Sequence, residues 1–376
     1  MYINTSKPYK IYADYVEPSA LQQFQEVMNQ DFVLHGVLLP DTHTGYTLPI
    51  GCAVLTQNCI VPAYVGYDIG CSALAAKLNI KYPDIENHLQ TIKIELLKKI
   101  PLGNNKHHIN IPNTPDWLFK SFTKIGQDLQ GTRAQGQLGT LGSGNHFYEI
   151  GKDEDNNIWI IIHSGSRGLG HGIASHYMKI AAANAGKTTG NNEGHYPLFK
   201  GTKDYNNYLK DCEAAQKWAQ LNREVMCDFG VEIISDIIEK HVTIMQMINH
   251  NHNHAKVLDE GVVIHRKGAV QAEKGQYGVI PMNMLDGSYI VKGKGNQESL
   301  CSSSHGAGRK MSRSKAKALL NFEEFSEMMS DVVSNISNNT LDENPLAYKN
   351  PTEVMAQQED LIEVVAKVKP LINIKG

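Results

Sequence analysis

Two histidines flank a segment that we expect to form a β-hairpin. His146 opens the run HFYEI and His163 closes the run IWIIIH, with the turn-rich segment GKDEDNN between them. With symmetric pairing the two residues are cross-strand neighbours, and their Cβ atoms lie roughly 5 Å apart on one face. Imidazoles at this separation can serve one metal site. The alternative is a coincidental pair of strand-end histidines.

A carboxylate and a thiol lie close together earlier in the chain. Asp68 and Cys71 belong to the run VGYDIGCSALA, whose apolar residues would shield the carboxylate from water at considerable cost unless it binds a cation or a donor. Thiolate and imidazole suit transition metals, and an added carboxylate suits manganese. Together with the two hairpin histidines, these residues form a mixed candidate ligand set. A free cysteine alone is usually a small core residue, so the combination carries the argument.

The segment INHNHNHAKV places His250, His252 and His254 at alternate positions. In an extended chain all three side chains would point the same way, as in a histidine-rich metal tract. A polar helix end is the alternative, and composition does not choose among the three histidines.

The segment CSSSHGAGRKMSRSKA combines a histidine with small residues and arginines. The small residues after His305 leave backbone N–H groups open to a phosphate, and a helix expected to begin near Ser312 adds a favourable dipole. Arg309 and Arg313 offer bidentate forks to the same anion. A neutral imidazole can attack phosphorus when a metal withdraws charge from the phosphoryl oxygens, so His305 is a candidate nucleophile. An ordinary loop histidine is the alternative.

Further basic residues stand beside glycine-rich turns. Arg167 lies in HSGSRGLGH, directly after a candidate metal ligand, and HRKGAV supplies Arg266 and Lys267 at a strand end. Together with Arg309 and Arg313 they predict a local positive surface, whose natural partner is a phosphate-rich substrate. The alternative is a set of ordinary surface charges.

Strands and helices are expected to alternate along the chain and to position these residues. We expect closely spaced buried strands between residues 41 and 78, the hairpin, and later strands in GVVIHRKGAV, YGVIPMNM and SYIVKG. Helical spacing occurs at 85–99, 204–247, 322–336 and 352–368, and the second of these is expected to break around residues 228–230. No internal repeat is present. The predicted fold is α+β, with central β-sheets and flanking helices in one compact domain over residues 1–376.

Composition narrows the class of protein. The 376 residues are 41% hydrophobic and 20% charged, which excludes disorder, and the net charge of -3 requires any nucleic-acid contact to come from a local patch. The six cysteines form no CxxC pair, which suits free thiols in a reducing compartment. The first residues do not resemble a secretion signal, and no run of about 18 apolar residues occurs. We therefore expect a soluble, cytoplasmic protein without a membrane partner.

Several motifs together resemble a known family. They are PDTHTGYTLPIG, VGYDIGC, GTLGSGNHFYEI, IHSGSRGLGH, HNHAK, HRKGA, SYIVKG, SSSHGAGRKMSRSKA and the terminal NIKG. In this order, from about residue 40 to the last residue, they resemble the RtcB family of RNA-splicing and repair ligases. The resemblance implies a mixed fold peculiar to this family, two Mn2+ ions, GTP as the activating nucleotide, and a guanylated histidine.

The resemblance also implies roles for individual residues. His305 becomes the guanylated residue, and Cys71 is placed to bridge the two ions. The implied metal ligands are Asp68, Cys71, His146, His163 and one histidine of the 250–254 tract, with the following HAK favouring His252. The implied nucleotide-binding residues are Asn145, Glu149, Asn283, Ser288, Gly306, Ala307, Gly308, Tyr348 and Lys375, of which Lys375 matches the lysine that contacts guanine. The candidates for binding RNA phosphates are Arg167, Arg309 and Arg313.

The implied reaction has three steps. His305 attacks the α-phosphate of GTP and releases pyrophosphate, an RNA 3'-phosphate then takes the GMP, and a 5'-hydroxyl finally displaces GMP to form the phosphodiester. The 3'-phosphate can come from an opened 2',3'-cyclic phosphate. The partner is therefore RNA with such ends, in tRNA splicing or RNA repair, and an archease-like activator is a further candidate.

One run departs from the family pattern. The family usually has Gly-Ser-Met-Gly-Thr after the proline of the IP motif, where this chain has Met282, Asn283, Met284, Leu285 and Asp286. Glycine permits close backbone approach to nucleotide phosphates, and bulkier side chains with a negative Asp286 would weaken it. Two alternatives to ligation follow: a Mn2+-dependent RNA end-processing phosphodiesterase or nucleotidyl enzyme, and an inactive RNA-binding paralogue.

Overall fold

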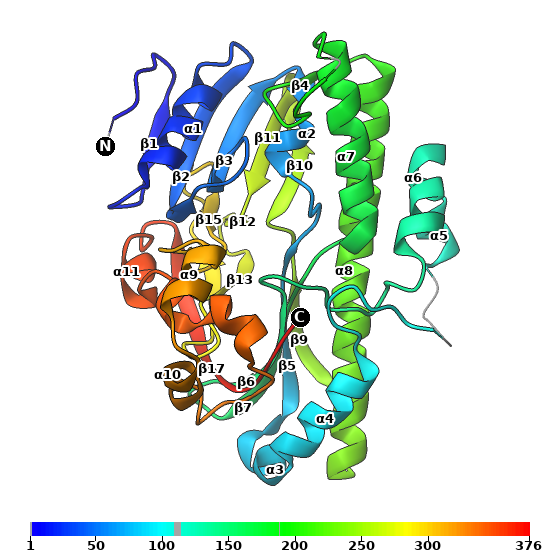
Figure 1. Cartoon of the computed structure of the whole chain (residues 1–376), viewed down its shortest axis with the longest axis vertical. Coiled ribbons are helices and arrows are strands. Elements are labelled where there is room, and N and C mark those ends of the chain that lie inside the picture. Colours follow the sequence, from blue (N-terminus) through cyan, green and yellow to red (C-terminus); the bar gives the residue numbers. More distant parts are fainter. Residues whose placement is uncertain (1, 109–113, 188) are drawn as a thin grey trace.

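The computed structural model describes residues 2–108, 114–187 and 189–376. Strands and helices are interleaved along the chain, and two large sheets stand beside a long pair of helices (Figure 1). The α+β class expected from the sequence is confirmed. Among the described residues, none of the helices combines the length and the apolar character needed to cross a bilayer.

The first sheet has five strands in the order β1-β2-β3-β11-β10. Its strands are β1 (Tyr9–Ile11), β2 (Val33–His43), β3 (Ile50–Gln57), β11 (Val262–Lys267) and β10 (Asn253–Val257). β1 and β2 are parallel, and the other neighbours are antiparallel. Helix α1 (Pro18–Met28) packs against β2 through Phe24 and Met28, which are fully buried.

The second sheet carries most of the candidate site. Its order is β13-β14-β17-β6-β7-β5-β9, with β16 paired beside β17. The strands are β13 (Tyr277–Pro281), β14 (Ser288–Gly293), β17 (Ile362–Lys375), β6 (Phe147–Lys152), β7 (Asn157–Ser164), β5 (Ser72–Lys81), β9 (Ile244–Asn249) and β16 (Val333–Ser334). β13 also lies against β5 and β9, so the sheet curls back on itself. Two further short pairs are β4 (Cys59–Ile60) with β8 (Leu198–Phe199), and β12 (Ala269–Gln271) with β15 (Ser302–Ser304). The first lies against β11 and α8, and the second contacts β2 and β3 of the first sheet and β13 of the second.

The helices cover the outer faces of the sheets. They are α2 (Pro62–Val65), α3 (Tyr82–Ile85), α4 (Leu89–Lys99), α5 (Asp116–Phe119), α6 (Lys124–Leu129), α7 (Arg167–Asn184), α8 (Lys203–Ile238), α9 (Arg313–Leu319), α10 (Phe322–Met328) and α11 (Pro351–Ala356). Short turns of 3-10 helix occur at Glu86–His88, Asp259–Gly261, Asn338–Glu343 and Pro345–Ala347, and a π turn at Gln130–Ala134. The expected helix at 85–99 is confirmed, and Ser312 caps α9 by accepting a hydrogen bond from the backbone of Lys315.

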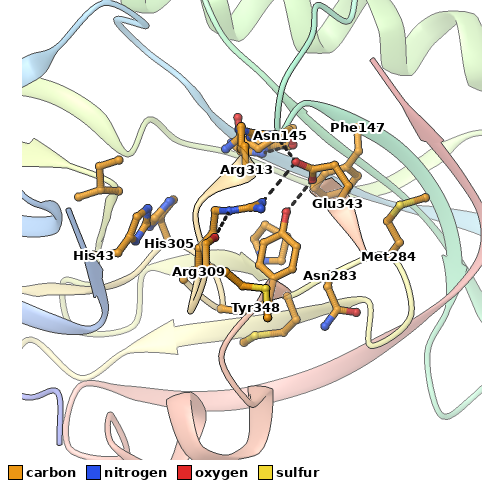
Figure 2. Close-up of a pocket in the computed structure, with 18 of the residues that line it drawn as sticks. His43, Asn145, Phe147, Asn283, Met284, His305, Arg309, Arg313, Glu343 and Tyr348 are labelled. Carbon is orange, nitrogen blue, oxygen red and sulfur yellow. Dashed lines mark hydrogen bonds and ion pairs between the residues drawn. The ribbon is translucent and has the colours of Figure 1, made fainter. Parts of the chain in front are cut away.

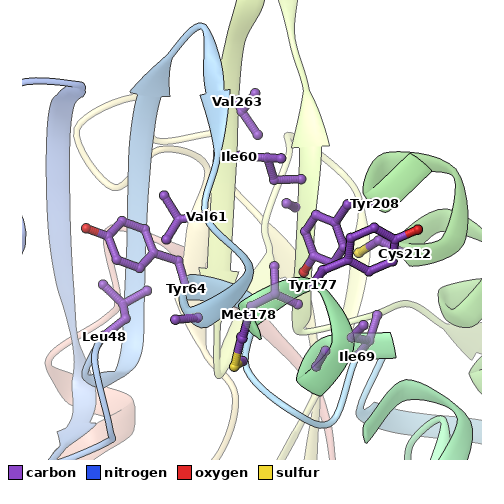
Figure 3. Packing of buried hydrophobic residues seen from close by; sticks show 14 of the residues in the cluster. Leu48, Ile60, Val61, Tyr64, Ile69, Tyr177, Met178, Tyr208, Cys212 and Val263 are labelled. Carbon is purple, nitrogen blue, oxygen red and sulfur yellow. The ribbon is translucent and has the colours of Figure 1, made fainter. Parts of the chain in front are cut away.

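A large hydrophobic core lies between the first sheet and the helices α2, α7 and α8. Figure 3 shows the aromatic rings of Tyr64, Tyr177 and Tyr208 packed with aliphatic side chains from the strands. These three tyrosines are fully buried. The other large core lies between the outer face of the curled sheet and the helices α4 and α8. Helix α8 therefore packs against both cores.

Three expected helices are wrong in extent. Helix α8 is continuous through residues 228–230 and ends at Ile238, because Gly230 fits closely against the buried Tyr148 of β6 instead of breaking the helix. The run at 322–336 ends as a helix at Met328 and continues into β16. The run at 352–368 leaves the helix at Ala356 and enters β17, whose β-branched residues favour a strand.

The contact at Gly230 yields a stability prediction. A Cβ atom there would lie 1.8 Å from Tyr148 Oη. Although Gly→Ala in a helix interior usually stabilises by about 1 kcal/mol, we expect Gly230→Ala to lower the free energy of unfolding by about 1–3 kcal/mol. Urea unfolding measures this change. The added variant Tyr148→Phe should restore most of the loss, and a Gly230→Ala protein as stable as the parent would contradict the packing.

Candidate active site

Cys71 stands at the centre of a buried cluster of potential ligands. Its Sγ atom lies 3.3 Å from His163 Nε2 and 3.5 Å from His146 Nε2. Asp68 Oδ2 lies 2.9 Å from His146 Nε2, and the His252 ring packs edge-on against His163. Five potential ligands from four distant segments therefore meet where β5 begins and β7 ends.

The ligand atoms fall into two groups that share the thiol. One group is Cys71, His163 and His252, and the other is Asp68, Cys71 and His146; within each, the atoms lie within 4.8 Å of one another. A carboxylate, a thiolate and imidazoles are the donors that suit manganese and related transition metals. The donor set therefore fits a transition-metal site.

Hydrogen bonds behind the imidazoles turn the outer nitrogens toward the cluster. The Nδ1 atom of His146 lies 2.9 Å from the carbonyl of Leu141, and the Nδ1 atom of His163 lies 3.2 Å from that of Asn145. Each Nδ1–H donates to its carbonyl, so each Nε2 faces Cys71. Asp68 Oδ2 faces His146 Nε2 at 2.9 Å, so a proton or a metal ion must lie between these two atoms.

Burial sets the protonation of the cluster. It lowers the pKa of His163 and His252 well below the usual value, so both rings are neutral at pH 7 and keep a free lone pair. Burial alone would raise the pKa of Asp68, but the hydrogen bond with His146 outweighs that effect and lowers the pKa to about 2. Burial and the neighbouring Asp68 raise the pKa of the Cys71 thiol, which a bound metal would deprotonate.

The hairpin register differs from the expected one by a single residue. Phe147, and not His146, pairs with His163. Asp153 and Asn157 close the hairpin, which leaves a three-residue turn whose last residue, Asn156, has φ 61°. An odd number of turn residues centres the hairpin on a residue instead of a peptide bond. His146 reaches the cluster from the loop before β6.

The three alternate histidines do not share one direction. His252 packs against both His163 and His305. His250 and His254 both line a separate cavity of about 200 Å³, and His254 Nε2 also lies 3.3 Å from Arg266 Nη1. The geometry thus joins only His252 to the cluster, because the backbone bends between residues 249 and 253, where β9 ends and β10 begins.

His305 is held by a carboxylate that sequence reasoning missed. Its Nδ1 lies 2.5 Å from Asp41 Oδ2, which also accepts the backbone N–H groups of His305 and Gly306 at 3.0 and 3.3 Å. Burial alone would raise the pKa of Asp41, but the His305 ring outweighs burial and lowers it. The signal was present in the run VLLPDTH, where a carboxylate lies among apolar residues as Asp68 does.

Beside His305 opens a cavity of about 540 Å³. Figure 2 shows His305 and His43 at one end, Glu343, Phe147 and Met284 at the other, and Arg309 and Tyr348 between them. The expected site residues that line it are Asn145, Asn283, Gly306, Ala307, Gly308, Tyr348, Lys375, Arg309 and Arg313, together with His163. The cavity thus joins the candidate nucleophile, the ligand cluster and most of the expected nucleotide residues.

Some expected residues lie outside the cavity. Glu149 and Ser288 are buried behind its wall, where Asn373, which lines the cavity, donates to Glu149 at 2.9 Å. Burial raises the pKa of Glu149 to about 8, so it is mostly a neutral acid at pH 7. Arg167 lies beside the cluster and donates to the carbonyl of Gly103.

The expected positive surface is wrong for Arg266 and Lys267, the last two residues of β11. They are 2% and 7% exposed. Arg266 donates hydrogen bonds to Ser302 and to the carbonyls of Leu300 and Cys301. Both residues are buried with the rest of this strand end and therefore form no surface patch.

A family model described as tRNA-splicing ligase RtcB matches residues 23–376. The chain belongs to the RtcB family. The RNA-splicing ligase RtcB of Escherichia coli K12 is 35% identical over 391 residues, which cover 96% of this chain and 95% of the relative. RNA-splicing ligase RtcB1 of Escherichia coli ATCC 25922 is 34% identical with the same coverage. The tRNA-splicing ligase RtcB of Nanoarchaeum equitans is 29% identical and covers 92% of this chain and 88% of its own. The resemblance seen in the motifs is confirmed.

The run that departs from the RtcB pattern forms a self-contained turn. Asn283 Oδ1 accepts the backbone N–H groups of Leu285 and Asp286, and its Nδ2 donates to Asp286 Oδ2 at 2.7 Å. Asp286 is not among the residues that line the cavity, whereas Met282 and Met284 are. The departure therefore adds apolar bulk to the cavity and places no negative charge at its wall.

One acidic residue, Glu343, lies at the end of the cavity away from His305 (Figure 2). Glu343 lies 2.6 Å from Lys375 Nζ and 2.5 Å from Arg313 Nη1, and it accepts the Tyr348 hydroxyl at 2.6 Å. Burial alone would raise the pKa of Glu343, but Lys375 and Arg313 outweigh it and lower the pKa to about 2. Lys375, Tyr348 and Arg313 were expected at the site from the family resemblance, whereas Glu343 was missed because it meets them only in the fold.

Glu343 should make stability depend on acid pH. Because its pKa in the folded chain lies below the unfolded value, its contribution is present above about pH 4.5 and is lost as pH falls toward 2. We expect Glu343→Gln to lower the free energy of unfolding by about 2 kcal/mol at pH 7. The difference from the parent should shrink below pH 4.5, as measured by urea unfolding. Glu298→Gln, which removes an exposed ion pair with Lys10, should change little; equal effects of the two substitutions would refute the role of burial.

Proposed function

We propose that this protein is a GTP- and Mn2+-dependent RNA ligase. It would join RNA ends that carry a 3'-phosphate or a 2',3'-cyclic phosphate to 5'-hydroxyl ends, through guanylated His305. One observation carries the proposal: His305 lines the cavity, is bonded to Asp41 on its inner nitrogen, and packs against His252 of the ligand cluster. The names of the curated relatives, RNA-splicing and tRNA-splicing ligases, agree with it.

The Asp41 carboxylate orients the His305 ring and selects the nitrogen that attacks. It accepts the proton of Nδ1, which leaves Nε2 as the nitrogen with a free lone pair. Attack of Nε2 on the α-phosphorus of GTP forms the P–N bond, and the electrons of the broken P–O bond leave with pyrophosphate. Mn2+ held by the two ligand groups would stabilise the negative charge that develops on the phosphoryl oxygens.

The second step is an attack on the phosphorus of the guanylate, and the third is an attack on the phosphorus of the RNA 3'-phosphate. An oxygen of the RNA 3'-phosphate attacks the guanylate and restores free His305. The 5'-hydroxyl then attacks the activated 3'-phosphate, and GMP leaves. The backbone of residues 306–308 would face the nucleotide phosphates, while Tyr348 and Lys375 would contact the base.

The arginines are proposed to hold RNA phosphates. Arg313 keeps 41% of its side chain exposed despite its ion pairs, so it retains donors for a phosphate. Arg309 lies over the Tyr348 ring, 4.9 Å from its centroid, and Arg167 lies beside Asp68 at the ligand cluster. Together they would position the two RNA ends along the cavity.

A second candidate is end processing without joining. The apolar bulk of Met282 and Met284 at the cavity wall favours it, since less room is left for a nucleotide. A gel assay with paired 2',3'-cyclic-phosphate and 5'-hydroxyl RNAs separates the two functions. Joined product supports ligation, and opened ends that are never joined support the phosphodiesterase.

We also propose a cytoplasmic location with RNA as the partner. All six cysteines are free and buried, as expected for a reducing compartment. An archease-like activator is a candidate second partner, which faster ligation on its addition would identify.

The nucleophile is tested by covalent labelling. Incubation with α-labelled GTP and Mn2+ should transfer label to the protein, and His305→Ala should abolish it, because no other nitrogen would be in line with the phosphate. Denaturing gels measure the label. Label that survives the substitution would remove His305 from the proposal.

Asp41 should control the rate of the same step. We expect Asp41→Asn to slow labelling about 100-fold or more, because the amide cannot stabilise the positive charge on the imidazole during attack. Mn2+ affinity should stay within about 2-fold, since Asp41 belongs to neither ligand group. Parent-like labelling rates in single-turnover experiments would contradict the orienting role.

A further inference from the structure

Arg223 is a fully buried arginine in the middle of α8. Its Nη1 donates to the carbonyl oxygens of Gly70 and Ser164, both at 2.8 Å. Its Nη2 donates to Asn251 Oδ1 at 2.9 Å, and its Nε donates to Asn249 Oδ1 at 2.8 Å. No carboxylate forms an ion pair with it among the residues that the structure describes.

Three of the four acceptor residues stand next to a candidate metal ligand in the sequence. Gly70 precedes Cys71, Ser164 follows His163, and Asn251 precedes His252. One guanidinium therefore bonds a neighbour of every member of the group Cys71, His163 and His252. These three segments are separated by about 90 residues in sequence at each step, so no local structure fixes their relative positions.

The packing around Arg223 is built for this contact. Gly70 has φ +74°, and a Cβ atom there would lie 2.9 Å from the Cα atom of Gln216, so α8 touches the loop backbone directly. Burying a cation is costly unless each donor is paired, and the planar fork of arginine reaches several acceptors at once. A lysine has a single nitrogen and could not bridge the three segments.

Asn222, the residue before Arg223 on the helix, supports the loop that holds His146 of the other ligand group. Asn222 accepts the backbone N–H groups of Gly139 and Thr140, and donates to Ser164 Oγ and the carbonyl of Gly165. Leu141, the next residue, is the one whose carbonyl accepts Nδ1–H of His146. Adjacent residues of α8 therefore support both halves of the cluster.

We propose that Arg223 is a positioning residue of the metal centre, which fixes Cys71, His163 and His252 relative to one another and thereby sets the affinity of the site for Mn2+. This inference rests on the metal centre of the proposed function. Arg223 touches neither substrate nor metal and acts through the backbone and the amide beside each ligand. Its loss would separate the ligand segments without removing a ligand.

The experiment compares Mn2+ affinity and stability in matched variants. We expect Arg223→Lys to weaken Mn2+ binding, measured by titration of the full-length protein, by about 10-fold or more. Asn251→Ala, which removes a single acceptor, should weaken it in the same direction by a smaller factor. With Co2+ as a spectroscopic probe, both variants should alter the thiolate-to-metal charge-transfer band, which a merely structural role would leave unchanged.

The control removes a buried polar group elsewhere on α8. Asp211 accepts hydrogen bonds from Thr123 and Tyr177, about 18 Å from Arg223 along the helix axis. Asp211→Asn should lower the melting temperature of the metal-free protein but keep Mn2+ affinity within about 2-fold of the parent. In Arg223→Ala, added guanidinium should restore part of the lost affinity.

The outcomes separate the two proposals. A parent protein that binds no Mn2+ overturns the metal centre of the proposed function. A parent that binds Mn2+, with Arg223→Lys and Asn251→Ala binding equally well, overturns the positioning role alone. Equal losses in Asp211→Asn and Arg223→Lys also overturn it, because general destabilisation would then explain both.

Discussion

Charged groups inside this protein are stable only where a fixed partner faces them, and the active site depends on that constraint. Asp41 faces His305 and two backbone N–H groups, Glu343 faces Lys375 and Arg313, and Arg223 faces carbonyl and amide oxygens. A buried charge without such a partner would cost several kcal/mol. Each pairing therefore ties together segments that are separated in sequence.

The cavity separates two kinds of chemistry along its length. Near His305 the walls offer imidazole nitrogens and backbone N–H groups, which suit phosphate and metal ions. Toward the other end the Tyr348 ring lies beside the Lys375–Glu343 ion pair, in which the cation and the carboxylate neutralise each other. A nucleotide has the same polarity, with phosphates at one end and a flat base at the other. The shape of the site thus agrees with a nucleoside triphosphate better than with a compact anion.

The sequence predicted the parts of the site that reside in single segments. Asp68, Cys71, His146, His163 and His305 were each found from local context, and the structure places all of them at one cavity or its adjoining cluster. Partners supplied by other segments were missed. Glu343 and Arg223 look like ordinary polar residues in a turn and a helix, and the signal of Asp41, a carboxylate among apolar residues, does not name its partner. The same limit explains the errors in the fold. Gly230 is a helix breaker by propensity, and only Tyr148 explains why it is there.

Strand β17 has a consequence for how the chain reaches this structure. It lies between β14 and β6, so residues 362–375 must enter the sheet beside residues 147–152, more than 200 positions earlier. Such distant pairing makes folding slow, because loop closure precedes most of the stabilising contacts. During synthesis the edges of β6 and β14 stay unpaired until this segment emerges from the ribosome. Nascent chains therefore expose two open strand edges, which are sites for mispairing and for chaperone binding.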